Sequence, residues 1–125
     1  MTSLAIRIVA IALLLPLVAA AADPTTKRQV RVTRYGYPGD PHATRNTRLA
    51  LGDHNNILNK DSVAVSPDLN AIFPYGSRVV INGSFLGLRH DTTNAKWRNT
   101  VAVYDPNGQW KEDFHAYIDA TPKKK

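Results

Sequence analysis

The chain contains no cysteine among its 125 residues. This absence excludes disulfide bonds, a thiolate nucleophile and the lipid-modified cysteine that anchors bacterial lipoproteins. If the protein is exported, apolar burial and backbone pairing must therefore hold its fold without covalent links. A closed β-barrel meets this requirement, because closure leaves no unpaired strand edge.

Several motifs of known chemistry are also missing. The sequence has no glycine-rich phosphate loop, no nucleophile elbow and no zinc-binding helix. Its histidines are scattered without the spacing of metal ligands; they are His42, His54, His90 and His115. We therefore expect neither a metal ion nor a cofactor.

The N-terminus contains an apolar run that is typical of a signal peptide. Arg7 precedes the run over residues 8–18, and Ala20–Ala22 supply the small residues that a signal peptidase recognises. An uncleaved anchor is the alternative, but a membrane span needs about 20 apolar residues, and this run is shorter and is interrupted by a proline. We predict a signal peptide over residues 1–22. The mature protein would then lack a membrane span and lie in the periplasm, the cell envelope or outside the cell.

The charge balance is basic, with 16 Lys and Arg against 10 Asp and Glu, a net charge of +6. Such a charge favours loose binding to polyanions. Outside a cell these are wall glycans with their peptide carboxylates, or lipid phosphates. Nucleic acid is a distant alternative, which export disfavours. Residues 120–125, with their lysines, are interpreted as a solvated basic tail.

The hydrophobic pattern predicts short strands and little helix. After a polar lead-in over residues 23–28, alternation begins at Gln29 and indicates a half-buried strand. Further strands are predicted over residues 62–65, 78–81, 85–89, 101–104 and 114–118. Six short strands are typical of a small barrel or sandwich, and the pattern does not choose between them.

Turn and helix signals separate these strands. Asn82-Gly83 between two apolar runs predicts a tight hairpin. Ser66-Pro67 predicts the start of a brief helix, with Ser66 as its N-cap, which ends before Pro74. The stretch over residues 35–51 is rich in turn-forming residues and predicts a long loop.

Three stretches of the chain occur in an order and spacing typical of one family. The first is Val32–Tyr35, the second runs from Ser62–Pro67 to Phe73–Gly76, and the third runs from Asp91–Asn94 to Val101–Tyr104. Together they resemble the three-aspartate (3D) domain found in bacterial cell-wall lytic transglycosylases and their relatives.

The resemblance implies an all-β, six-stranded double-psi barrel over residues 29–119 that binds peptidoglycan glycan strands. It also implies three aspartate positions, of which the third usually supplies the general acid and base. Asp91 fits the second position, whereas Ser66 and Ala102 occupy the first and third. We therefore predict a monomeric protein of wall turnover that binds glycan or cleaves it weakly, with Asp91 as the catalytic candidate. A fully active lytic enzyme that uses Asp91 alone is the alternative.

Lytic cleavage needs one carboxyl group, which protonates the glycosidic oxygen and then takes a proton from the sugar's own 6-hydroxyl. Neighbouring acids raise the pKa of such a group, whereas basic residues lower it. Because two acids are replaced and Arg89 and Lys96 lie near in sequence, we expect a low pKa and an ionised Asp91. A structural role for Asp91 is equally compatible, because its carboxylate could cap the turn at Thr92-Thr93.

Two other acids stand near the replaced positions. Asp68 follows Ser66, and Asp105 follows Ala102, so either could supply a missing carboxyl group. A helix acid in the first turn and a turn former are the simpler roles of Asp68 and Asp105, respectively.

Aromatic and polar side chains provide candidates for sugar binding, because aromatic faces suit the apolar faces of sugars. Trp97 lies in a polar segment between Lys96 and Arg98 and is expected to be the most exposed of the aromatic residues. Core or rim packing is the alternative role for about half of them. The predicted substrate-binding residues are Tyr35, Tyr37, Tyr75, Thr92, Asn94 and Trp97, with Trp110 as a further aromatic candidate.

Overall fold

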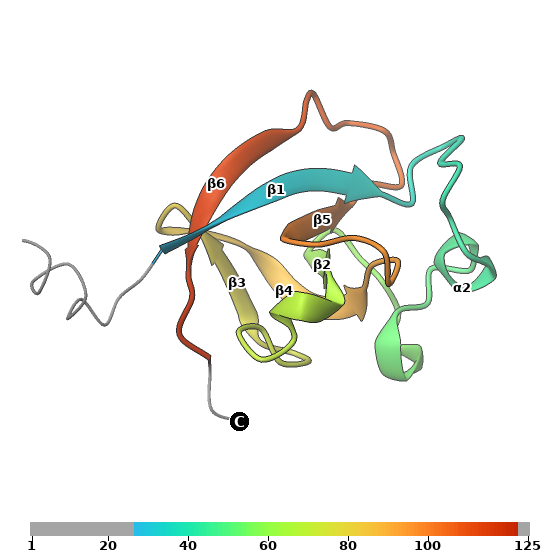
Figure 1. Cartoon of the computed structure of the whole chain (residues 1–125). Coiled ribbons are helices and arrows are strands. Elements are labelled where there is room, and N and C mark those ends of the chain that lie inside the picture. Colours follow the sequence, from blue (N-terminus) through green and yellow to red (C-terminus); the bar gives the residue numbers. More distant parts are fainter. Residues whose placement is uncertain (1–26, 123–125) are drawn as a thin grey trace, which may run out of the picture.

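The computed structural model describes residues 27–122. Figure 1 shows a mostly β fold in which six strands form one curled sheet and the helices are single turns. The prediction of six short strands with little helix is confirmed. The predicted signal peptide and the last three lysines lie outside the described residues.

In chain order the elements are β1 (Lys27–Tyr35), α2 (Arg45–Arg48), the 3-10 turn η1 (Asp53–Asn55), β2 (Ser62–Val65), the 3-10 turn η2 (Pro67–Leu69), β3 (Arg78–Ile81), β4 (Ser84–Thr92), β5 (Thr100–Tyr104) and β6 (Phe114–Asp119).

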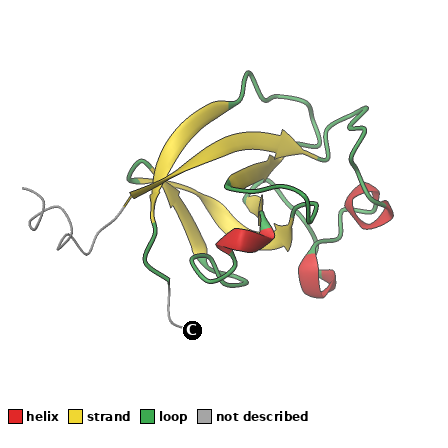
Figure 2. Ribbon diagram, in the orientation of Figure 1, coloured by secondary structure: helices red, strands yellow, loops and turns green. Residues whose placement is uncertain are grey.

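The sheet has the strand order β3-β4-β2-β5-β1-β6. The pairs β1–β5 and β2–β4 are parallel, and the other neighbouring strands are antiparallel. The two edge strands approach each other where the backbone N–H of Asn82 donates to the Tyr117 carbonyl at 3.1 Å and the Tyr117 N–H donates to the Asn82 side chain at 3.0 Å. The sheet thus curls into a half-barrel, and Figure 2 shows two of the helical turns beyond one end of it.

One face of the curled sheet forms the hydrophobic core. Alternate residues of the strands point to this face, as period-two patterning requires. Leu69, Ile72 and Phe73, from η2 and the segment after it, complete the core from outside the sheet. The strand residues of the core are Val30, Val32, Val63, Val65, Val79, Ile81, Val101, Ala116 and Ile118.

The opposite face of the sheet positions the candidate site. Residues directly opposed on neighbouring strands point to the same face. A row across β1, β5, β2 and β4 is formed in this way by Thr33, Ala102, Ala64 and Asp91. The loop over residues 36–61 covers this face, so Ala64 is buried as well as Val63 and Val65, which point to the core.

Several local predictions can be compared with the structure. The hairpin turn is confirmed, because Asn82 and Gly83 take φ values of 49° and 81°. The loop before β2 contains a helical turn that was not predicted, which Thr44 caps by accepting a hydrogen bond from the Thr47 N–H. Ser66 precedes η2 as predicted, but it makes no cap hydrogen bond. Its hydroxyl instead accepts from the Thr100 N–H at 3.0 Å, because β5 lies beside it.

Within residues 27–122, no helix has the length and hydrophobicity needed to span a membrane.

Candidate functional site

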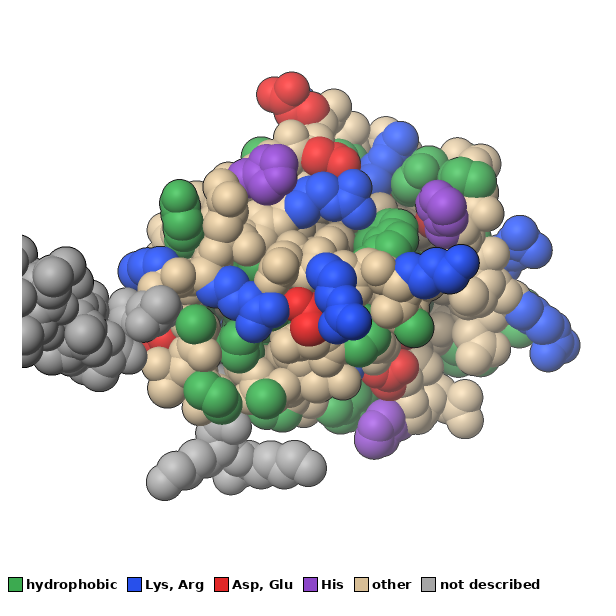
Figure 3. Space-filling view, in the orientation of Figure 1, with side chains coloured by type: hydrophobic (Ala, Val, Ile, Leu, Met, Phe, Trp, Pro, Cys, Tyr) green, Lys and Arg blue, Asp and Glu red, His purple; other side chains and the backbone are tan. Residues whose placement is uncertain are grey.

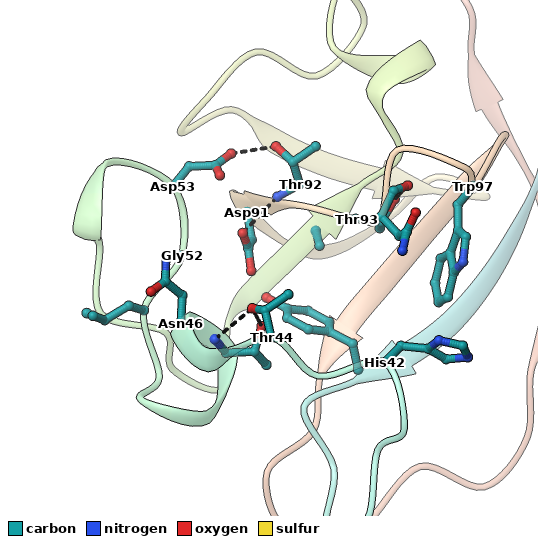
Figure 4. Close-up of a pocket in the computed structure, with 14 residues that line it drawn as sticks. His42, Thr44, Asn46, Gly52, Asp53, Asp91, Thr92, Thr93 and Trp97 are labelled. Carbon is teal, nitrogen blue, oxygen red and sulfur yellow. Dashed lines mark hydrogen bonds between the residues drawn. The ribbon is translucent and has the colours of Figure 1, made fainter.

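A pocket of about 170 Å³ lies between the covered face of the sheet and the loop over residues 36–61. Figure 4 shows the Asp91 carboxyl group pointing into this pocket, with Asn46 and Gly52 on one side and Trp97 and His42 on the other. The sheet contributes Tyr35, Ala64, Asp91 and Thr92; the covering loop contributes His42, Thr44, Asn46, Thr47, Leu51, Gly52 and Asp53; and the segment after β4 contributes Thr93, Asn94 and Trp97. We call this hollow the acid pocket.

A second carboxylate, Asp53, belongs to the acid pocket and is fixed by hydrogen bonds. The Thr92 hydroxyl donates to Asp53 Oδ2 at 2.6 Å, and Arg89 Nη2 donates to the Thr92 hydroxyl at 2.8 Å. Arg89 Nη2 also lies 3.6 Å from Asp53 Oδ2. Asp53 is therefore held against the end of β4, although it stands 38 positions before Asp91 in the sequence.

Arg89 is a buried cation beneath the pocket, with 6% of its surface exposed. Its guanidinium donates to the Phe73 carbonyl at 2.9 Å and to the Asn70 side chain at 2.8 Å, in addition to Thr92. A buried charge needs such a set of partners to offset its desolvation. Arg89 thus ties the end of β4 to the segment after η2 and orients Thr92 toward Asp53.

The pKa of Asp91 is raised to about 6. Burial is the main cause, and the negative charge of Asp53 adds to it. Three groups oppose the shift: the Thr92 N–H, which donates to Asp91 Oδ1 at 2.9 Å, the Tyr35 hydroxyl and the charge of Arg89. The expectation of a low pKa is therefore wrong. The sequence suggested an isolated carboxylate among basic residues, whereas the fold buries Asp91 and brings a second acid to it.

Tyr35 places its hydroxyl in the acid pocket beside the Asp91 carboxyl group. The oxygen is buried and makes no hydrogen bond of standard geometry within the described residues, but the hydroxyl lies close enough to Asp91 to interact with its carboxylate. Burial, followed by the negative charge of Asp91, raises the pKa of Tyr35 above its ordinary value, so the hydroxyl keeps its proton. A buried hydroxyl without a well-formed hydrogen bond is uncommon and calls for an explanation. In this pocket the hydroxyl could donate to the Asp91 carboxylate or to a ligand.

The structure places the sequence candidates in two groups. Asp91, Tyr35, Thr92, Asn94 and Trp97 line the acid pocket. Tyr37, Tyr75 and Trp110 do not line it: the Tyr37 ring lies beneath the Arg34 guanidinium, the Tyr75 ring stacks on His54 at 4.2 Å, and Trp110 packs against the core.

The ranking of the aromatic residues by exposure was wrong. Tyr75 is exposed, at 40% of its surface, whereas Trp97 is only half-buried. Trp97 is partly covered because the Arg31 guanidinium lies 5.0 Å above its ring and the His42 ring meets it edge-on at 5.9 Å.

The local environment of Asp91 also differs from the prediction. The strand before Asp91 was predicted to end at residue 89, but β4 continues to Thr92, so that Asp91 belongs to the strand. Its bond from the Thr92 N–H is the local cap that the sequence allowed. The Asp91 side chain therefore makes this local hydrogen bond and also lines the acid pocket.

Asp68 and Asp105 have structural roles elsewhere. Asp68 pairs with Arg28 at 2.7 Å and accepts the Asn99 N–H, whereas Asp105 accepts the N–H groups of Gln109 and Trp110 in the turn after β5. Neither lines the acid pocket. Asp53, which does, gave no local sequence signal, because only the path of the covering loop brings it to β4.

The part of the chain that the structure describes contains no cluster of three or more His, Cys, Asp or Glu residues that could hold a metal ion. Comparisons of the chain with family models, with curated proteins and with solved structures found no match.

Proposed function

We propose that the acid pocket binds a glycan strand of bacterial peptidoglycan and that Asp91 cleaves it weakly by lytic chemistry. In this proposal the protein is exported, and its half-barrel is a 3D-type double-psi barrel that acts in wall turnover. The observation that supports it most is Asp91 itself: a carboxyl group of raised pKa, pointing into a pocket beside the Tyr35 hydroxyl.

The raised pKa suits Asp91 to both steps of the lytic reaction. A general acid must be protonated in part at the working pH, which a pKa of about 6 permits near neutrality. Asp91 would protonate the glycosidic oxygen, and its carboxylate would then accept the proton of the sugar's 6-hydroxyl as the anhydro ring closes. The Tyr35 hydroxyl would donate to a sugar oxygen, and the half-buried Trp97 ring would stack on a sugar face.

We expect weak rather than full activity because Ala102, in the same row of residues as Asp91, has no carboxyl group. Ala102 fits the position at which relatives have their acid and base, and it points to the same face two strands away. At a strand spacing of about 4.8 Å, its Cα lies roughly 10 Å from that of Asp91. The methyl group cannot transfer a proton, and a general acid or base is typically worth about 10²–10⁴-fold in rate.

Digestion of purified sacculi tests the chemistry. The protein should release anhydro-muropeptides slowly, and the rate should fall as the pH rises through about 6 and above, because the protonated fraction of Asp91 falls about tenfold for each further pH unit. Product analysis by mass spectrometry distinguishes the mechanisms. Free reducing ends instead of anhydro ends would indicate hydrolysis by two carboxyl groups, with Asp53 as the second, and would contradict the lytic proposal.

Binding to insoluble sacculi tests the site separately from cleavage. Binding should weaken with salt, because exposed charges are screened over about 8 Å at physiological ionic strength. The part that survives high salt should fall about tenfold in Trp97→Ala, since ring stacking is worth roughly 1 kcal/mol and burial of the ring adds to it. Tyr75→Ala, which removes an exposed ring outside the acid pocket, is the control and should bind normally. Equal losses in both variants would argue against the pocket.

A further inference from the structure

A second hollow shares Trp97 with the acid pocket. It is a groove of about 400 Å³ between the beginning of β1 and the segment that leads into β5. Residues 29–31 line one side, residues 97–100 line the other, and His115 contributes from β6. None of these described residues is acidic. We call this hollow the cationic groove.

Two arginines of the cationic groove are available to a ligand. Arg31 lies over the Trp97 ring, and its ion pair with Asp113 is long, at 4.0 Å, with both side chains more than 40% exposed. Such a pair is worth little and can open. Arg98 is exposed and has no ion pair within the described residues. Figure 3 shows Lys and Arg side chains in a band across the face over which β1 runs.

Asn99 adds a fixed donor to this groove. It takes a left-handed φ of 47°, which asparagine tolerates better than other side chains. Arg28 Nε donates to Asn99 Oδ1 at 2.6 Å, and Asp68 holds both residues by accepting from Arg28 and from the Asn99 N–H. Since its oxygen is engaged, the Asn99 amide nitrogen is the group left to donate to a ligand.

We propose that the cationic groove binds a carboxylate carried by the glycan strand whose sugar occupies the acid pocket. This inference rests on the function proposed above. Three groups of the groove can only donate hydrogen bonds: the guanidinium groups of Arg31 and Arg98 and the Asn99 amide nitrogen. They therefore favour a ligand group that only accepts hydrogen bonds, and the two parallel N–H groups of a guanidinium match the two oxygens of a carboxylate. Trp97, which lines both hollows, would lie between the sugar and its charged substituent.

Calorimetric titration with three oligosaccharides tests this subsite. The ligands are a neutral N-acetylglucosamine tetramer, a wall tetrasaccharide without peptides, and the same tetrasaccharide with its stem peptides. At low salt we expect the carboxylate-bearing ligands to bind about tenfold more tightly than the neutral tetramer, as charge-assisted hydrogen bonds predict, and high salt should reduce this preference. Tighter binding of the tetrasaccharide without peptides than of the neutral tetramer would show that the groove binds the sugar's own lactyl carboxylate. Tighter binding only of the tetrasaccharide with peptides would show that the groove binds a carboxylate of the stem peptide.

Two variants of the cationic groove should remove the preference while neutral binding remains. Arg98→Gln deletes a charge, and Asn99→Gly deletes the amide but permits the same φ. Lys60→Gln, an exposed lysine that lines neither hollow, is the control and should retain the preference. Equal affinity of the wild type for neutral and anionic ligands, or equal losses for both ligands in Arg98→Gln, would overturn the subsite and leave the proposed function standing. Failure of all three ligands to bind would refute both.

Discussion

Asp91→Asn should abolish the slow cleavage of sacculi and at the same time make the protein more stable above pH 6. Asparagine has no proton to give, so the rate should fall by about 10²-fold or more, to background. It keeps a side-chain oxygen in the place where Asp91 Oδ1 accepts the Thr92 N–H. The change therefore removes the chemistry without removing the local hydrogen bond.

The gain in stability follows from the sign of the pKa shift of Asp91. The carboxyl group has a pKa of about 6 in the folded state against an ordinary value of 3.8, so the folded state holds a proton that the unfolded state has lost between these pH values. The free energy of unfolding consequently falls as the pH rises from about 4 to 6, and it stays at the lower value above pH 6. The neutral asparagine avoids this loss.

Thermal denaturation at two pH values measures this effect. Because Asp91 is partly exposed and solvent screens it, we expect a gain of only about 1 kcal/mol, which is roughly 4–8 °C in Tm for a domain of this size. The gain should be present at pH 8 and nearly absent at pH 4. Asp61→Asn, at an exposed aspartate away from the acid pocket, should change neither Tm nor cleavage. A lower Tm for Asp91→Asn at pH 8 would show that the carboxylate stabilises the fold and that its pKa is not raised.

Gly52→Ala should unfold or strongly destabilise the protein, by about 2–3 kcal/mol, the upper range for overpacking a buried site. Gly52 is buried, and an added Cβ would lie 2.4 Å from the His90 carbonyl oxygen and 2.8 Å from Leu58 Cδ2. Its φ of −100° suits any residue, so the cost arises from this close approach and not from backbone strain. The loop would have to move away from β4, and Asp53 would move with it.

Urea denaturation of Gly52→Ala and Gly39→Ala separates the two possible costs of replacing a glycine. Gly39 has a φ of 82°, and a Cβ added there would meet open space, so its replacement should cost only the left-handed backbone penalty of roughly 1–2 kcal/mol. Where Gly52→Ala remains folded, glycan binding should also fall, because the Asp53–Thr92 hydrogen bond is lost. A Gly52→Ala protein with wild-type stability would contradict the close packing of the loop on β4.

The strands could be predicted from the sequence because their causes are local. Alternating apolar residues and the Asn82-Gly83 turn predicted all six strands within a few residues of their observed bounds. The largest difference is β4, which extends to Thr92 because β2 pairs with it through Val65. A pairing of this kind depends on a partner strand elsewhere in the chain, which a local pattern does not reveal.

The acid pocket could be predicted only in part. Asp91 and Trp97 were found from the resemblance and from residue type, and the structure brings both to one hollow. The second carboxylate of Asp53 and the buried cation of Arg89 depend on long-range contacts, so the electrostatics of Asp91 were predicted with the wrong sign. A pKa reflects burial and the charges that the fold assembles around a group, and neighbours in sequence are a poor guide to it.

Wall glycan should bind in the acid pocket, and chemical-shift mapping with the peptide-free tetrasaccharide tests this most directly. Amide signals of the ¹⁵N-labelled protein would be followed during the titration, together with the indole N–H of Trp97. We expect saturable shifts concentrated at Asp91, Thr92, Asn94 and the Trp97 indole, with little change at Tyr75. Saturable shifts elsewhere, or none at all, would contradict it.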